Sequence, residues 1–202
     1  MSAPVSLPPV PRRTLGWFSR SGRCGCLVLA GCLSLVGAPA PGAERVVSKE
    51  YQLKAAYLYN FTKFVEWPEQ RFRDPASPIV IGVLGRNPFG DELNNIVRDR
   101  TVNGHTILVI LITTPDDLRA VHLLFVPAGE EPRPEFAAAL AQRPGVLTAG
   151  ESGTFLAGGG VITFTQADDK LRFTINLESA ERAGLKLSAQ LLKLATVVHQ
   201  RP

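Results

Sequence analysis

Apolar and polar positions separate the chain after residue 47 into short strands and short helices. Residues 79–84 and residues 106–112 form two continuous apolar runs of strand length, which is typical of strands covered on both faces. Residues 121–126 predict a third strand, and residues 145–148 predict a fourth, shorter one. Because turn residues and short helical patterns separate these runs, we expect parallel strands that are connected by helices.

Residues 48–67 predict one amphipathic helix with defined ends. Ser48 is a good N-cap, because its hydroxyl can accept a hydrogen bond from an amide of the first helical turn. Trp67 and Pro68 end the pattern, since proline lacks an amide hydrogen and disfavours helical geometry in the residue before it. A set of mainly apolar side chains falls on one face of this helix, which the rest of the domain must cover. The set is Leu53, Tyr57, Asn60, Phe61 and Phe64.

Further helices and a hairpin complete the pattern. Helices are predicted over residues 91–97 and 134–143, and the second has a proline in its first turn. Residues 161–165 and 170–177 predict an antiparallel hairpin, because apolar and polar residues alternate in its second strand. A last helix is expected over residues 188–198. Its buried stripe would be Leu187, Leu191, Leu194, Ala195 and Val198.

These elements predict a layered α/β domain with a mixed sheet. Parallel strands come first, a C-terminal antiparallel hairpin is added, and helices cover the sheet. Residues 44–202 have the length of a single domain that can bury its own hydrophobic core.

The first 43 residues have the pattern of a secretory signal peptide. Four arginines and no acid precede an apolar run at residues 26–37, and small residues at 38–43 predict cleavage after Ala43. Two other interpretations stay open. Residues 29–32 have the form of a lipobox, which would leave the protein anchored by a lipid on Cys32, and Arg12-Arg13 resembles a twin-arginine signal. All three interpretations export the protein, so we expect it in the periplasm.

Removing this leader changes the charge and the cysteine content. The chain has 22 Lys and Arg against 18 Asp and Glu, and four of the arginines but none of the acids lie in the leader. The remaining domain is therefore formally neutral, which gives no support for binding to nucleic acid. All three cysteines precede residue 44, so the domain cannot use a disulfide as a staple or as a redox switch.

Three glycine-containing segments resemble ligand-binding or catalytic motifs only in part. Residues 85–90 follow a strand and precede a helix, as a phosphate-binding loop does, but Asp91 and Glu92 would repel a phosphate. Residues 158–160 precede a strand and favour a tight bend over a ligand contact. Residues 150–154 nearly match a nucleophile elbow around Ser152, but Thr154 replaces the closing glycine.

No metal or catalytic cluster is evident in the pattern of titratable residues. His105, His122 and His199 are isolated from one another, and the adjacent acid pairs fall at helix starts or turns, where capping and solvation explain them. The sequence therefore predicts a protein that is not an enzyme, with no cofactor and no metal.

Two surfaces could bind a partner or a ligand. Ligands of open α/β sheets sit beyond the carboxyl ends of the parallel strands, where we expect a rim that also includes residues 127–130. Its candidate residues are Arg86, Asn87, Thr113, Glu151 and Ser152. Aromatic residues of the first helix that do not fit its buried face could anchor a protein partner. Tyr59 and Trp67 are the candidates, although Trp67 could instead close the end of the core.

The chain resembles the YfiR family of periplasmic signalling proteins. Residues 54–68, with the sequence Lys-Ala-Ala-Tyr-Leu-Tyr-Asn-Phe-Thr-Lys-Phe-Val-Glu-Trp-Pro, resemble the opening signature of that family. Residues 159–164, 170–177 and 183–195 resemble its closing half. With residues 82–104 between them, the resemblance covers nearly everything after residue 47.

This resemblance implies a regulator that represses an inner-membrane diguanylate cyclase. Similar proteins bind the periplasmic part of the cyclase and lower cyclic di-GMP output, which affects biofilm formation. An outer-membrane, peptidoglycan-associated lipoprotein sequesters them, and members of the family tend to form homodimers. Family members can also carry disulfides, a property that does not transfer to this cysteine-free domain.

Two alternatives come from other functional classes. One is a small-ligand binding protein that serves a transporter or a sensor kinase, with its ligand at the strand-end rim. The other is a hydrolase, which would need Ser152, a histidine and an acid within hydrogen-bond reach of one another.

Overall fold

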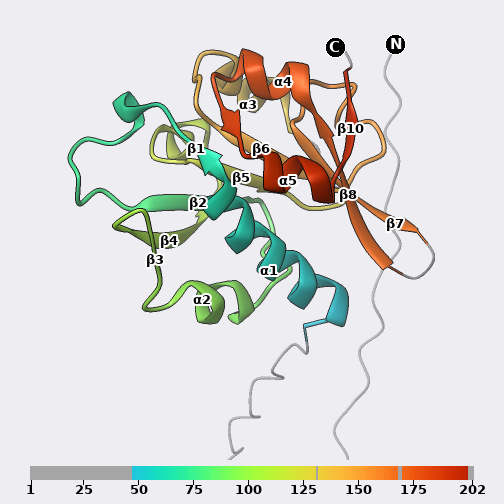
Figure 1. Ribbon diagram of the computed structural model, residues 1–202, viewed down its shortest axis with the longest axis horizontal. Helices are drawn as coiled ribbons and strands as arrows, with labels where there is room; N and C mark the ends of the chain where they lie inside the picture. The colour runs from blue at the N-terminus through green and yellow to red at the C-terminus, as the bar shows by residue number, and fades with distance from the viewer. Residues whose placement is uncertain (1–46, 131, 168–169, 200–202) are drawn as a thin grey trace, which may run out of the picture. The chain divides into compact units, whose positions relative to one another are not determined.

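The computed structural model describes residues 47–130, 132–167 and 170–199 (Figure 1). The predicted leader with Cys32, and residues 168–169 of the predicted hairpin, lie outside the described residues. Within them, no helix has the length and apolar character that crossing a membrane requires.

The helices are α1 (Lys49–Phe64), α2 (Glu92–Val97), α3 (Pro134–Ala141), α4 (Leu177–Arg182) and α5 (Ala189–Leu194), with short 3-10 turns η1 (Glu69–Arg71) and η2 (Pro115–Arg119). The strands are β1 (Val65–Glu66), β2 (Ile79–Leu84), β3 (Thr101–Val102), β4 (His105–Ile112), β5 (Leu123–Val126), β6 (Leu147–Gly150), β7 (Ile162–Ala167), β8 (Lys170–Asn176), β9 (Lys186–Leu187) and β10 (Thr196–Val198).

The main sheet is mixed, which confirms the predicted fold class. Its strand order is β10-β8-β7-β6-β5-β2-β4-β3. Strands β4, β2, β5, β6 and β7 are parallel, β8 is antiparallel to β7, and β1 pairs with β9 in a separate two-stranded sheet. Strand β2 lies between β4 and β5. The chain first continues from β2 to β4 on one side, and then crosses back to β5 on the other side of β2. The carboxyl ends of β2 and β5 therefore flank a topological switch point, where α/β proteins commonly form sites.

Two apolar cores lie on the two faces of this sheet. One contains Ala55, Leu58 and Phe61 of α1 with Leu93 and Val97 of α2. The other contains residues of η2 and α3. Figure 1 shows α1 and α2 below the sheet and α3 above it. Aromatic rings fill the larger core, where for example the rings of Phe61 and Phe164 stack with centroids 5.8 Å apart. Such packing fixes α1 across the sheet.

Helix α1 begins where the sequence predicts and ends earlier. Ser48 Oγ accepts the amide hydrogen of Tyr51, which confirms the N-cap. The helix stops at Phe64 and not at Trp67, because Val65 is already extended and pairs with Leu187 of β9. β-Branched valine suits this extended pairing.

The buried face of α1 is rotated from the predicted one. Leu53 was expected in the core, but 54% of its surface is exposed. Lys54 is buried in its place, because its ammonium group forms an internal ion pair with Glu151. The residues that α1 buries are Lys54, Ala55, Leu58, Phe61 and Thr62.

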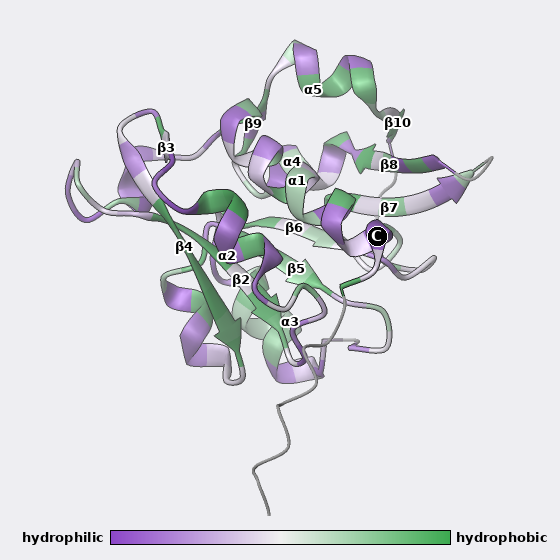
Figure 2. Cartoon of the chain, turned by 90° about the horizontal axis from the view of Figure 1, so that it is seen from below, coloured by the Kyte–Doolittle hydropathy of each residue, from purple (hydrophilic) through white to green (hydrophobic). Residues whose placement is uncertain are grey.

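Strand β4 is less covered than its apolar sequence predicts. Figure 2 shows it coloured as hydrophobic along most of its length. Leu108 and Leu111 are nevertheless about half exposed, at 50% and 49%. Strand β3 pairs only with the first two residues of β4, so the rest of β4 forms an exposed edge of the sheet. The prediction of a strand covered on both faces is wrong here.

The C-terminal segment differs from the single helix predicted over residues 188–198. Helix α5 ends at Leu194, and residues 196–198 form β10 beside β8. Leu194, expected in the buried stripe, is 69% exposed, whereas Leu191 is buried. Consecutive β-branched residues in β10 favour a strand over a helix. Helix α4 was not predicted, and it begins where the Asn176 side chain accepts the Ser179 amide hydrogen.

Candidate functional site

The carboxylate of Glu151 joins three segments at the carboxyl ends of β5 and β6. Glu151 directly follows β6 and accepts hydrogen bonds from the Lys54 ammonium, from Tyr51 Oη at 3.1 Å and from the Ala128 amide at 2.6 Å. Lys54 also contacts Glu50, which lies one helical turn earlier in α1. The Lys54 and Glu151 side chains are only 5% and 6% exposed. We call Glu50, Tyr51, Lys54 and Glu151 the Lys54 cluster.

The electrostatics of the Lys54 cluster keep Tyr51 protonated. Burial, with the negative charge of Glu151 and its hydrogen bond, raises the pKa of Tyr51 to about 12. Tyr51 therefore acts as a hydrogen-bond donor, and its ring packs edge-on against Phe89 with centroids 5.6 Å apart. The cluster ties α1 to the ends of β5 and β6 and occupies the acceptor atoms of Glu151.

The other predicted rim residues are held by local contacts. Arg86 lies close enough to Tyr51 for its charge to act on the tyrosine. The Asn87 side chain accepts the Phe89 amide and donates to the Gly90 carbonyl, and the Thr113 amide and hydroxyl both donate to Asp117. Ser152 Oγ lies 2.8 Å from Thr154 Oγ1. The structure thus brings Glu151 and Arg86 within electrostatic range of Tyr51, while Asn87, Thr113 and Ser152 stabilise turns.

A second cluster of aromatic and imidazole rings lies toward the amino ends of β2, β4 and β5. Phe72 stacks on His105 with centroids 4.2 Å apart and on His122 with centroids 4.7 Å apart. Trp67 packs edge-on against His122 and donates its indole hydrogen to the His122 carbonyl at 3.0 Å. These contacts agree with the interpretation that Trp67 closes the end of the core. Its role as a partner contact stays a prediction.

His122 is expected to make the fold sensitive to mild acid. Its side chain is 3% exposed and its Nδ1 accepts the Val80 amide at 3.1 Å. Burial, with the charge of Arg71, lowers the pKa of His122 to about 4. The unfolded chain binds this proton below about pH 6.5, so stability should fall from there toward pH 4, by at most about 1.4 kcal/mol per pH unit from this residue. Urea unfolding at pH 7 and pH 5 measures the loss.

The control for His122 is His122→Asn, whose amide oxygen can replace Nδ1 as the acceptor but does not titrate. Its unfolding free energy should change less between pH 7 and pH 5 than that of the unchanged protein. Equal pH dependence in both proteins would contradict this assignment.

Tyr59 of α1 is flanked by two cations, Lys63 of the same helix and Arg100 between α2 and β3. Lys63 Nζ lies 4.2 Å from the centroid of the Tyr59 ring, and the Arg100 guanidinium lies 4.9 Å from it. Lys63 and Arg100 are exposed and Tyr59 is partly exposed. We call Tyr59, Lys63 and Arg100 the Tyr59 patch. Tyrosine and arginine are enriched among residues that dominate protein–protein binding energy, and this patch is positively charged.

The described residues do not assemble the hydrolase triad that was one alternative. Ser152 follows the carboxyl end of β6. His105 begins the parallel strand β4, His122 precedes β5, and His199 follows β10, which runs opposite to β6. All three histidines therefore lie toward the amino end of β6. No group of three His, Cys, Asp or Glu within the described residues could hold a metal ion.

The sequence pattern contains a signal for the burial of Lys54. Lys54 falls at the same helical spacing as the buried residues Leu58 and Phe61, and Glu50 precedes it by four positions. A charged residue on a buried stripe implies an internal partner. The identity of that partner, Glu151, could not be read from the sequence because 97 positions separate the two residues.

Comparison with known proteins matches the chain to a protein family. The family model described as YfiR/HmsC-like matches residues 51–196, which include most of α1, the strands from β2 to β8 and α5. No curated protein matches the chain. The family match agrees with the resemblance that the sequence signatures carry.

Proposed function

Because the chain belongs to the YfiR/HmsC-like family of periplasmic signalling regulators, we propose that it binds the periplasmic part of an inner-membrane diguanylate cyclase and represses it. The observation that carries this proposal is the family match, which spans almost the whole described domain. Repression would lower cyclic di-GMP output and so reduce biofilm formation. No catalytic step by this chain is needed for the proposed function.

A shift between conformers of the membrane protein would account for repression. A regulator that binds an inactive conformer more tightly than an active one raises the population of the inactive conformer. The shift in the free-energy difference between the two conformers can be no larger than the difference between the two binding free energies. A rigid binding surface suits this role, and the Lys54 cluster and the aromatic core hold α1 firmly on the sheet.

The Tyr59 patch is the surface that we assign to this partner. It combines an aromatic ring with two exposed cations, so it suits an acidic segment of the membrane protein. Glu151 is unsuited to the same task because its oxygens already accept three internal donors. Release by an outer-membrane, peptidoglycan-associated lipoprotein, and formation of a homodimer, belong to the same proposal.

Co-purification from detergent-solubilised inner membranes tests the proposed function. A diguanylate cyclase, or a sensor kinase as the other member of this partner class, is expected to be recovered with the protein. Recovery of neither would contradict the proposal.

A further inference from the structure

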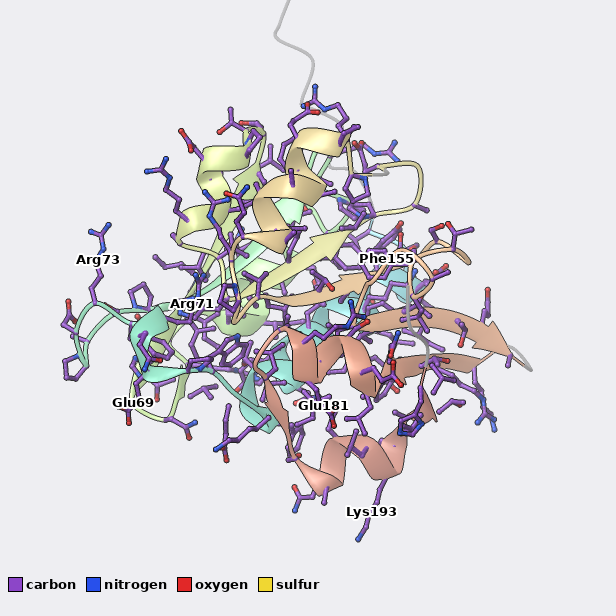
Figure 3. All side chains as sticks on the ribbon, turned by 90° about the horizontal axis from the view of Figure 1, so that it is seen from above. Glu69, Arg71, Arg73, Phe155, Glu181 and Lys193 are labelled. Carbon is purple, nitrogen blue, oxygen red and sulfur yellow. The ribbon has the colours of Figure 1, made fainter. Side chains whose placement is uncertain are left out.

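A pocket of about 810 Å³ lies between α3, α4 and the glycine-rich loop after β6. Figure 3 shows α3 and α4 on the same side of the molecule, with the loop that carries Phe155 beside them. Apolar side chains that include Leu140, Val146 and Phe155 line the pocket. Neither Glu151 nor any residue of the Tyr59 patch is part of the lining. The volume is within the range of roughly 300–1,000 Å³ that is typical of small-molecule sites.

Two glycines allow Phe155 to form a wall of this pocket. A Cβ atom at Gly150 would lie 2.5 Å from Cδ2 of the Phe155 ring, and a Cβ atom at Gly160 would overlap the opposite edge of the ring. The ring therefore fits into a slot that only glycine leaves open at both positions. Phe155 is 9% exposed and its position is fixed by the backbone on both sides. The wall is part of the folded structure and does not depend on a ligand.

Among the described residues, the charged side chains that line the pocket are both arginines. Arg143 follows α3 and Arg182 ends α4, and no aspartate or glutamate among the residues that the structure describes lines the pocket. Arg182 Nη2 donates to Ser179 Oγ at 2.9 Å, and Arg143 Nη1 donates to the Ala139 carbonyl at 3.1 Å. Neither guanidinium forms an ion pair with a carboxylate in the described parts of the chain. Each has further N–H donors that can bind an anion.

A third arginine adds positive charge behind the pocket. The Arg71 side chain passes over Gly145, two residues after Arg143, and donates to the Val121 carbonyl. Its Nε is buried and has no acceptor among the described residues. Burial and the charge of Arg143 lower the pKa of Arg71, which shows that the two cations repel each other. An anion at Arg143 would reduce this repulsion.

We propose that this pocket binds a small carboxylate with an apolar body. The carboxylate would lie between Arg143 and Arg182, because guanidinium groups bind carboxylates through paired hydrogen bonds. The apolar body would pack against Phe155 and Leu140, where burial of apolar surface favours binding. This site is separate from the surface assigned to the membrane partner, so the inference does not rest on the proposed function.

Titration of the purified protein with octanoate, octanamide and acetate tests this site. Octanoate has both the charge and the apolar body, octanamide lacks the charge, and acetate lacks the body. We expect octanoate to bind at least about tenfold more tightly than octanamide, because it keeps the charged hydrogen bonds to arginine. We expect a similar advantage over acetate, because octanoate also buries an apolar chain. During the octanoate titration, the backbone amide NMR signals that move should be those of lining residues such as Ala157 and Gly158.

Two variants and one control locate the binding. Arg182→Gln should weaken octanoate binding about tenfold or more, and Ala137→Trp should block it by filling the pocket from an exposed helix position. Arg119→Gln changes an exposed arginine on η2, outside the pocket, and should have no effect. Equal binding of octanoate and octanamide, equal binding to all variants, or no binding at millimolar octanoate would overturn the proposal. A folded spectrum of each variant excludes loss of binding through unfolding.

Discussion

Lys54→Met is expected to lower the free energy of unfolding at pH 7 by about 3–5 kcal/mol, because it leaves the buried carboxylate of Glu151 without its cation. The Lys54 and Glu151 side chains are 5% and 6% exposed, so water cannot replace the lost partner. Tyr51 and the Ala128 amide would still donate to Glu151, but neither carries a positive charge. Urea unfolding followed by circular dichroism measures the change.

Lys63→Met is the matched control, since it makes the same substitution at an exposed position of the same helix. We expect it to change the free energy of unfolding by no more than about 0.5 kcal/mol. The double variant Lys54→Met, Glu151→Gln removes both charges and should recover part of the loss. If Lys54→Met were as stable as Lys63→Met, the ion pair would have no role in holding α1 on the sheet.

Gly160→Ala is expected to destabilise the protein by about 3 kcal/mol, the upper end of what overpacking usually costs. The added Cβ would overlap the Phe155 ring and lie 2.8 Å from the Phe155 carbonyl oxygen. Backbone cannot yield as a flexible side chain can, so the glycine-rich loop would have to move. Thermal unfolding by calorimetry measures the effect.

Gly153→Ala tests the same substitution elsewhere in this loop. Nothing lies within 4 Å of a Cβ at Gly153, so this variant should be as stable as the unchanged protein or slightly more stable. Combining Gly160→Ala with Phe155→Leu should cost less than the sum of the two single changes, because the smaller side chain removes part of the overlap. Strict additivity would contradict the assigned contact.

The fold class followed from the apolar pattern, because the strands that build the centre of the sheet are continuous apolar runs. Strand β2 has the predicted bounds, and the hairpin of β7 and β8 was found at the predicted place. The pairing of very short strands could not be predicted from the sequence. The two-residue strands β1 and β9 depend on contact between Val65 and Leu187, which lie far apart in the sequence. Such contacts come from tertiary structure, which local patterns do not encode.

Burial was less predictable than secondary structure for the same reason. Leu53 and Leu194 have the apolar character of core residues, but the helices present them to solvent. Lys54 has the character of a surface residue, but Glu151 offers it an internal partner. In each case a contact elsewhere in the fold decided which side of the helix was covered.

The place of Glu151 in the fold was predictable, but its contacts were not. The strand-end rule placed Glu151 beyond the carboxyl end of a parallel strand, where the structure has it. The hydrogen bonds that its carboxylate accepts from Lys54, Tyr51 and Ala128 could be seen only in the structure. The pocket beside Phe155 could not be predicted from the sequence, since only the fold places Arg143 and Arg182 along one pocket.

Co-purification with solubilised inner-membrane proteins tests the central proposal most directly when the Tyr59 patch is changed at the same time. The double variant Lys63→Glu, Arg100→Glu reverses the charge at two exposed positions, and Arg119→Glu on the opposite face of the sheet is the control. We predict that the unchanged protein and the control recover a diguanylate cyclase or a sensor kinase, and that the folded double variant does not. Equal recovery by all three proteins would contradict the assigned surface, and recovery of no signalling protein by any of them would contradict the regulator itself.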